Sequence, residues 1–101
     1  MVNAMTEAPK AVFAVIDAAR KGEIDVLEAL LADGGKADET DEFGNSALMY
    51  AAACGHPGIC RRLIDAGAST KHANKWSMDA RDWSRWSEKR DEVIAVLRGD
   101  A

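Results

Sequence analysis

The sequence predicts an all-α fold, a solenoid of three helix–turn–helix units joined by hairpin-like turns. The first observation lies in residues 41–74, where two short helical patterns are separated and bordered by turn residues. The second is an internal repeat. A shift of 33 residues places Gly22 on Gly55 and Gly34 on Gly67, and it aligns small and apolar positions throughout. Repeated units of this kind bury their apolar faces against their neighbours and form elongated stacks.

The central unit carries a boundary signal at each helix end. Ser46 is a good N-cap for a first helix that runs to about Cys54. Pro57 suits the first turn of a second helix, because its missing N–H would have no partner there. Gly67 is expected to end that helix in a left-handed conformation. The apolar face of the second helix is expected to consist of Ile59, Cys60, Leu63 and Ile64.

The first unit is expected to hold a helix over residues 6–21, capped by Thr6, and a second helix over residues 24–33. Asp17 stands where both later units have an aromatic residue, which suits an end unit whose outer side meets water. The predicted buried positions are Val12, Val15, Ile16, Ala18 and Ala19 in the first helix, and Val26, Leu27, Leu30 and Leu31 in the second.

The third unit is expected to start at Asp79, an N-cap for a helix to about Trp86. Its last helix spans about residues 92–97, with Val93, Val96 and Leu97 facing inward. Arg81 and Arg85 replace apolar residues of the central unit. Buried unpaired charges would cost several kcal/mol, so we expect both to face solvent in a C-terminal cap.

The central stretch resembles the ankyrin repeat family. The family pattern is Asp, Gly-x-Thr-Pro-Leu-His-x-Ala-Ala, Gly-His, a Val/Ile–Leu-Leu helix and Gly-Ala. It stands here as Asp41, Gly44, Ser46, Ala47, Leu48, Met49, Tyr50, Ala51, Ala52, Gly55, His56, Ile59, Leu63, Ile64, Gly67 and Ala68. Ser, Ala and Met replace the family's Thr, Pro and His. The resemblance implies one ankyrin-repeat domain over residues 1–101, with repeats at about 7–40 (N-cap), 41–73 and 74–101 (C-cap).

The resemblance also implies a non-catalytic protein–protein interaction module. In the family, hairpin tips and first helices line a concave face where partner proteins dock. Phe43 and Trp76 are equivalent tip residues, and large exposed apolar side chains of this kind anchor interfaces. The alternative is that they cover the ends of a small core. The expected protein-binding residues are Glu42, Phe43, Asn45, Lys75, Trp76, Met78 and Trp86.

The charge distribution limits the kinds of partner. The net charge is −4, and residues 1–40 alone hold four basic and eight acidic side chains. An acidic chain without a basic stripe is not expected to bind nucleic acid. The acidic run over residues 38–42 would favour a partner with a basic segment, or it is simply a solvated face.

The chain lacks both a long apolar run and a secretory signal pattern, so no membrane span or secretion is expected. Two cysteines are too few for a disulfide framework, which points to the cytoplasm. We expect no catalytic residues, no metal and no cofactor, because the sequence holds no nucleophile set and no zinc-ligand spacing. His56 is expected to make structural hydrogen bonds, and His72 is expected to be solvated.

Two alternatives to a monomeric binding module remain open. Cys54 is expected near the inner surface, where it could act in a thiol-based redox or stress regulator. Cys60 is expected on a buried face, so a disulfide between the two cysteines is not expected. The other alternative is a structural subunit that associates with itself through its aromatic tips.

Overall fold

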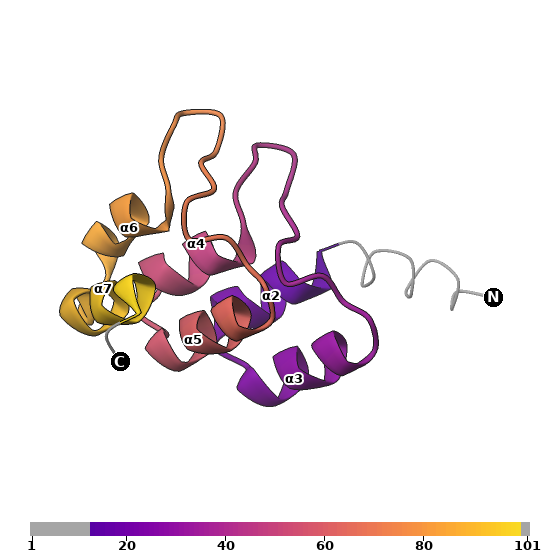
Figure 1. Ribbon diagram of the computed structural model, residues 1–101. Helices are drawn as coiled ribbons and strands as arrows, with labels where there is room; N and C mark the ends of the chain where they lie inside the picture. The colour runs from indigo at the N-terminus through magenta and orange to yellow at the C-terminus, as the bar shows by residue number, and fades with distance from the viewer. Residues whose placement is uncertain (1–12, 100–101) are drawn as a thin grey trace.

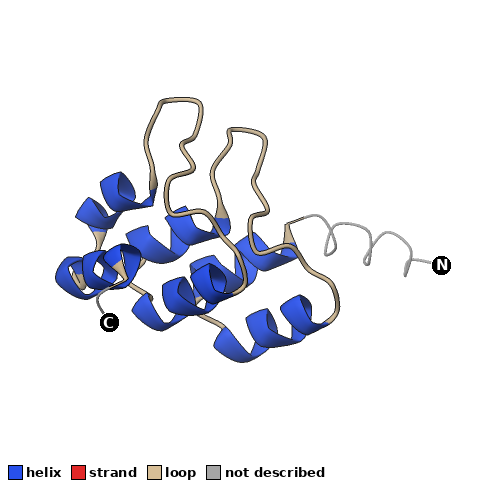
Figure 2. Ribbon diagram, in the orientation of Figure 1, coloured by secondary structure: helices blue, strands red, loops and turns tan. Residues whose placement is uncertain are grey.

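The computed structural model describes residues 13–99. Their helices form two layers, with two hairpin loops projecting to one side (Figure 1). The first layer holds α2 (Ala14–Lys21), α4 (Ala47–Ala53), α6 (Ala80–Trp83) and a short 3₁₀ turn, η1 (Ser84–Trp86). The second layer holds α3 (Ile24–Ala32), α5 (Pro57–Asp65) and α7 (Arg90–Arg98). Figure 2 shows helices and loops only in this part of the chain, which confirms the predicted all-α solenoid.

The helices of the first layer keep the 33-residue register. They begin at Ala14, Ala47 and Ala80. Ser46 caps α4 as predicted, because its Oγ accepts a hydrogen bond of 3.2 Å from the backbone N–H of Met49. Asp79 caps α6 in the same way. These caps satisfy N–H groups that have no partner inside the helix.

The predicted helix over residues 6–21 is interrupted at Phe13, and α2 begins at Ala14. Phe13 has φ −123° and ψ 42°, which is not helical. A continuous helix from Thr6 to Lys21 is therefore wrong, and Thr6 itself lies outside the described residues. Phe13 cannot cap α2, so Glu39 from the first hairpin takes this role. Its Oε2 accepts from the backbone N–H of Ile16 at 3.3 Å. Burial raises the pKa of Glu39, because the carboxyl is partly removed from water.

The core lies between the two layers. Helices of four to nine residues are too short to be stable alone, so their packing holds the fold together. Cys60 is fully buried, as the sequence predicted. The largest fully buried apolar side chains come from all three helix pairs: Val15, Leu27, Leu48, Met49, Leu63 and Val93.

The prediction for α3 was only partly right. Leu27 is buried, but Val26 is 46% exposed and Leu30 is half-buried. Among the described residues, α3 is the first helix of its layer, and no other described element covers its outer side. At the other end of the stack, Arg81 and Arg85 are exposed, as predicted from the cost of burying unpaired charges.

His56 connects the first two helix pairs. Its Nε2 lies 3.3 Å from the backbone oxygen of Arg20. The imidazole ring also packs on Gly22, where an added Cβ would come within 2.7 Å of it. Gly22 has φ 75°, so both its backbone and its neighbour require the absence of a side chain. His56 therefore makes the structural contact predicted for it.

Candidate functional site

Asp41 organises the first hairpin. Its Oδ1 accepts hydrogen bonds from the backbone N–H groups of Phe43 and Asn45, both at 2.9 Å. Its Oδ2 accepts from the hydroxyl of Tyr50 at 2.7 Å, which ties the loop to α4. Burial alone would raise the pKa of Asp41, but these hydrogen bonds outweigh it and hold the pKa below its usual value. The hairpin is thus pinned by one ionised carboxylate.

Asn74 organises the second hairpin in the same manner, 33 residues later. Its Oδ1 accepts from the backbone N–H groups of Trp76 at 2.8 Å and Met78 at 3.1 Å. The turns also match: Gly44 has φ 80°, and Ser77 at the equivalent position has φ 63°. Because Asn and Asp side chains readily mimic a turn of the backbone, the two loops share one conformation.

The two hairpins are bonded to each other. The buried Nδ2 of Asn74 donates to Oδ1 of Asn45 at 2.8 Å. Nearer the tips, the backbone N–H of Lys75 donates to the backbone oxygen of Phe43 at 3.1 Å. The tips of the two loops are therefore held side by side.

His72 adds a further link and corrects one expectation. It was predicted to be solvated, but its Nε2 lies 2.7 Å from the backbone oxygen of Gly44, and the ring is half-buried. His72 thus joins the base of the second hairpin to the turn of the first.

This framework presents two aromatic rings, which we call the tip pair, Phe43 and Trp76. Their ring centroids lie 5.8 Å apart with an interplanar angle of 34°. Phe43 is 45% exposed and Trp76 is 62% exposed. This exposure argues against the alternative that the two rings cover the ends of the core, and the rings contact each other.

The other predicted binding residues fall into different places. Glu42 and Lys75 are exposed beside the tip pair, and the Lys75 ammonium lies 5.9 Å from the Phe43 ring centroid. Met78 is half-buried. Asn45 is 7% exposed, and its side chain is hydrogen-bonded to Asp41 and Asn74 within the hairpins. It therefore gives the tips structural support.

Trp86 belongs to a separate aromatic group on the first-layer helices. It is 58% exposed and contacts Trp83 edge-on, with centroids 5.8 Å apart. Trp83 in turn meets Tyr50 edge-on at 5.2 Å and packs against the core. The site therefore has two aromatic parts, the tip pair and Trp86.

The acidic run is only partly available to a partner. The carboxylates of Glu39 and Asp41 are used inside the molecule, on the N-terminus of α2 and within the first hairpin. Asp38 and Glu42 are exposed. These two acids are the members of the run that can face a basic segment.

Sequence reasoning did not identify Asp41, Asn74 and His72 as the residues that position the tips. A signal was present for the first two. They lie one repeat apart, each begins a turn, and Asx residues are favoured at such positions. No comparable signal marks His72, because its partner is a backbone oxygen 28 residues away in sequence.

Other chemistry has little support in the described part of the chain. Cys54 is exposed and Cys60 is buried, and both are free thiols. Burial raises the pKa of Cys60 to about 12. Within residues 13–99, no three His, Cys, Asp or Glu side chains meet in an arrangement that could hold a metal ion. None of the helices in this range has the length and apolar character needed to cross a bilayer.

Comparison with known proteins identifies the class. Residues 4–87 match the family model for ankyrin repeats (3 copies). The chain therefore belongs to the ankyrin repeat family, as its residue pattern predicted. Proteins of this family generally bind other proteins and are typically not catalysts.

Individual relatives cover shorter stretches. Ankyrin repeat domain-containing protein 63 of Mus musculus is 38% identical over 47 residues, which is 46% of this chain. An ankyrin repeat-containing protein of Saccharomyces cerevisiae is 35% identical over 49 residues, or 48% of this chain. The matched stretches are 12% and 10% of the relatives' own lengths, so this chain spans only a small part of these proteins.

Proposed function

We propose that the chain is a non-catalytic binding module that holds a segment of another protein on its hairpin tips and concave face. The observation that carries the proposal is the tip pair. Two large aromatic rings, Phe43 and Trp76, stand exposed at the ends of loops that are internally bonded. A loop fixed before binding loses little conformational entropy when the partner arrives.

The tip pair suits an extended segment that offers an apolar side chain. Such a side chain would pack on the exposed faces of Phe43 and Trp76, and aromatic anchors of this kind dominate interface energies. Glu42 and Lys75 would set the polarity around it, and Asp38 together with Glu42 would favour a basic residue in the partner. Asn45 would act indirectly, by holding the tips in place.

An affinity capture with quantitative mass spectrometry tests this proposal. Wild-type protein, Phe43→Ala/Trp76→Ala and Lys71→Ala would be immobilised at equal density, and lysate of the source organism would be passed over each. Lys71 is exposed in the second hairpin and serves as the matched control. We expect a partner held by wild type and Lys71→Ala and depleted at least about tenfold with the double variant, since losing a hot-spot aromatic costs about 2 kcal/mol.

The double variant must show the same far-UV circular dichroism as wild type. If all three proteins then captured the same partners equally, the tip pair would not be the anchor. Trp86→Ala, tested in the same way, would separate the two aromatic parts. A partner lost with Trp86→Ala but kept by the tip variant would move the binding site onto the helices.

A further inference from the structure

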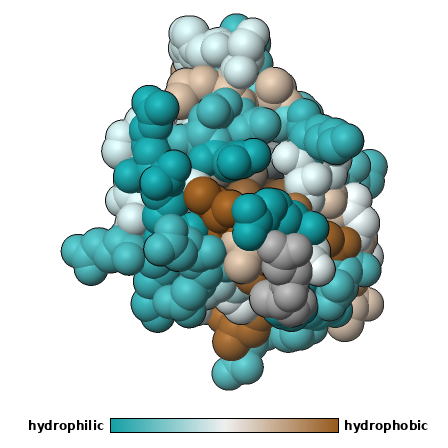
Figure 3. All heavy atoms as spheres, turned by 60° about the vertical axis from the view of Figure 1, so that its left-hand side comes forward, coloured by the Kyte–Doolittle hydropathy of each residue, from teal (hydrophilic) through white to brown (hydrophobic). Residues whose placement is uncertain are grey.

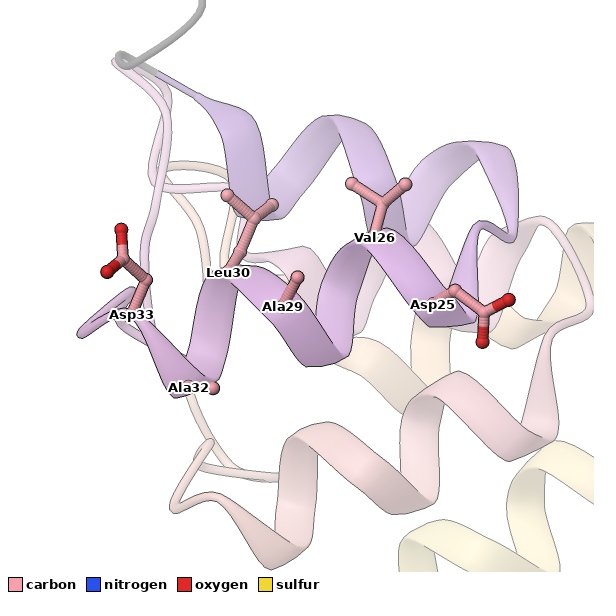
Figure 4. A pocket seen from close by; sticks show the side chains of 6 residues that line it. All are labelled: Asp25, Val26, Ala29, Leu30, Ala32 and Asp33. Atoms are coloured by element: carbon pink, nitrogen blue, oxygen red, sulfur yellow. The ribbon is translucent and has the colours of Figure 1, made fainter.

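The outer side of α3 carries an open apolar groove at the end of the stack opposite α7. Val26, Ala29 and Leu30 line it, with Ala32 beside them, in a hollow of about 810 Å³. Figure 4 shows Val26 and Leu30 extending from one side of α3, with Asp25 and Asp33 at the two ends of the row. Val26 is 46% exposed. This groove is separate from the hairpin tips.

The residues of the groove are of the type that this fold buries elsewhere. One repeat later, Ile59 takes the place of Val26 and Leu63 takes the place of Leu30. Ile59 is 4% exposed and Leu63 is fully buried. In the third repeat the Val26 position is held by the exposed Glu92. The sequence therefore places residues of core type on a helix face where Val26 is exposed and Leu30 is only half-buried against the core.

The other end of the stack behaves differently. An end repeat of a solenoid normally has a polar outer face, because no further repeat covers it. Figure 3 shows the end formed by α6, η1 and α7, and its surface is mostly hydrophilic with small hydrophobic areas. Within the described residues, α3 instead presents an apolar outer side. An exposed apolar patch with polar borders marks an interaction surface.

The charges around the groove indicate the occupant. Residues 23–33 contain four acidic side chains and no lysine or arginine. Glu28 is paired with Arg62 of α5 at 2.7 Å. Asp25 and Asp33 are exposed and border the groove. At 1.5 Å per helical residue, these two carboxylates are about 12 Å apart along α3.

We infer that this groove binds an amphipathic helix of a partner protein, with a narrow apolar stripe flanked by Lys or Arg residues two turns apart. Its apolar side chains pack on Val26 and Leu30, and the small Ala29 lets the two helices approach closely. Its basic side chains reach Asp25 and Asp33. Helix-in-groove recognition of this kind reads apolar residues at i, i+3, i+4 and i+7. The chain can then hold two partner segments at once, one at the tips and one on α3.

A synthetic peptide tests the inference directly. The probe is a helical peptide of about 18 residues, or five turns, with Leu and Ala on one face and Lys on both flanks. A matched peptide carries Glu at the Lys positions. Binding of the labelled peptides to the full chain is measured by fluorescence anisotropy at near-physiological salt. We expect the Lys peptide to bind at least about tenfold more tightly than the Glu peptide, the fold-change that 1.4 kcal/mol gives.

Variants of the chain locate the binding. Asp25→Asn/Asp33→Asn and Val26→Ser should each weaken the Lys peptide by about tenfold or more, the effect of 1.4 kcal/mol. Asp65→Asn/Asp91→Asn changes the net charge equally at exposed positions away from the groove, and it should leave binding unchanged. All four substituted residues in the charge variants are exposed, so the fold is retained.

Three results would overturn the inference. The first is no binding of the Lys peptide by the wild-type chain. The second is equal binding by wild type and Val26→Ser, or an equal loss in both charge variants, since either would reduce the effect to unspecific charge attraction. The third is a dimer in sedimentation experiments that Val26→Ser dissociates, because a second copy would then occupy the groove.

Discussion

Asn74 provides a sharp test of how the hairpins are held. Its side chain is 8% exposed and makes three hydrogen bonds: its Oδ1 accepts two within the second hairpin, and its Nδ2 donates one to Asn45. Asn74→Ala removes all three. It leaves two backbone N–H groups and one amide oxygen without partners. At about 1 kcal/mol for each hydrogen bond, the free energy of unfolding should fall by about 3 kcal/mol.

Urea unfolding followed by circular dichroism measures this loss. For a domain of this size, 3 kcal/mol corresponds to a fall in Tm of about 12–24 °C. Lys71→Ala in the same hairpin should change the free energy of unfolding by less than about 0.5 kcal/mol, because its side chain is exposed. Asn74→Asp keeps the two acceptor bonds, as Asp41 does in the first hairpin, and loses only the donor. The loss in free energy of unfolding for Asn74→Asp should lie between the losses for Asn74→Ala and Lys71→Ala.

Equal urea midpoints for Asn74→Ala and Lys71→Ala would refute the reasoning. The hairpins would then be held by packing of the tip pair and not by the buried amides. If Asn74→Asp were as damaging as Asn74→Ala, the bond to Asn45 would outweigh the two bonds within the turn.

Further predictions concern a strained turn, the hydrogen-bonded carboxylate of Asp41 and a thiol. Ser77 has φ 63°, so Ser77→Gly should relieve left-handed strain. The free energy of unfolding should rise by up to about 1 kcal/mol, seen as a higher urea midpoint, whereas Ser77→Ala should give no rise. The pKa of Asp41 is lowered in the folded chain, so its stabilisation is complete above the unfolded pKa and is lost as pH falls through the folded pKa. Tyr50→Phe removes one hydrogen bond to that carboxylate and should make the fall in stability between pH 6 and pH 3 smaller. Burial raises the pKa of Cys60 to about 12, so a thiol reagent at pH 8 should modify only Cys54 in the native chain and both cysteines in urea. Modification of Cys60 in the native chain would show that α5 opens readily.

The sequence predicted the fold well where the signals were local. Ser46 and Asp79 are caps, and a cap depends on residues within one turn of it. The register of the first-layer helices followed from the 33-residue repeat, and these helices begin at Ala14, Ala47 and Ala80. The start of α2 at Ala14 was missed because its capping group, Glu39, comes from a distant hairpin. No local pattern could reveal that contact.

The candidate site was predictable in part for the same reason. That Phe43 and Trp76 occupy equivalent loop tips follows from the repeat. That the two rings contact each other depends on bonds between loops, such as Asn74 to Asn45. Asn45 was expected to face a partner, but it is buried between the hairpins. This burial depends on how the two loops pack together, which the sequence of one loop alone does not reveal.

The sequence by itself determined the repeat class, the order of helices and the residues that end them, because capping, turn formation and a 33-residue period act over short stretches of chain. The tertiary structure alone decided which apolar side chains stay exposed. Val26 and Ile59 occupy the same position in successive repeats, yet one is open and the other is buried. Burial depends on whether a neighbouring element lies over a residue, and only the packed stack supplies that neighbour.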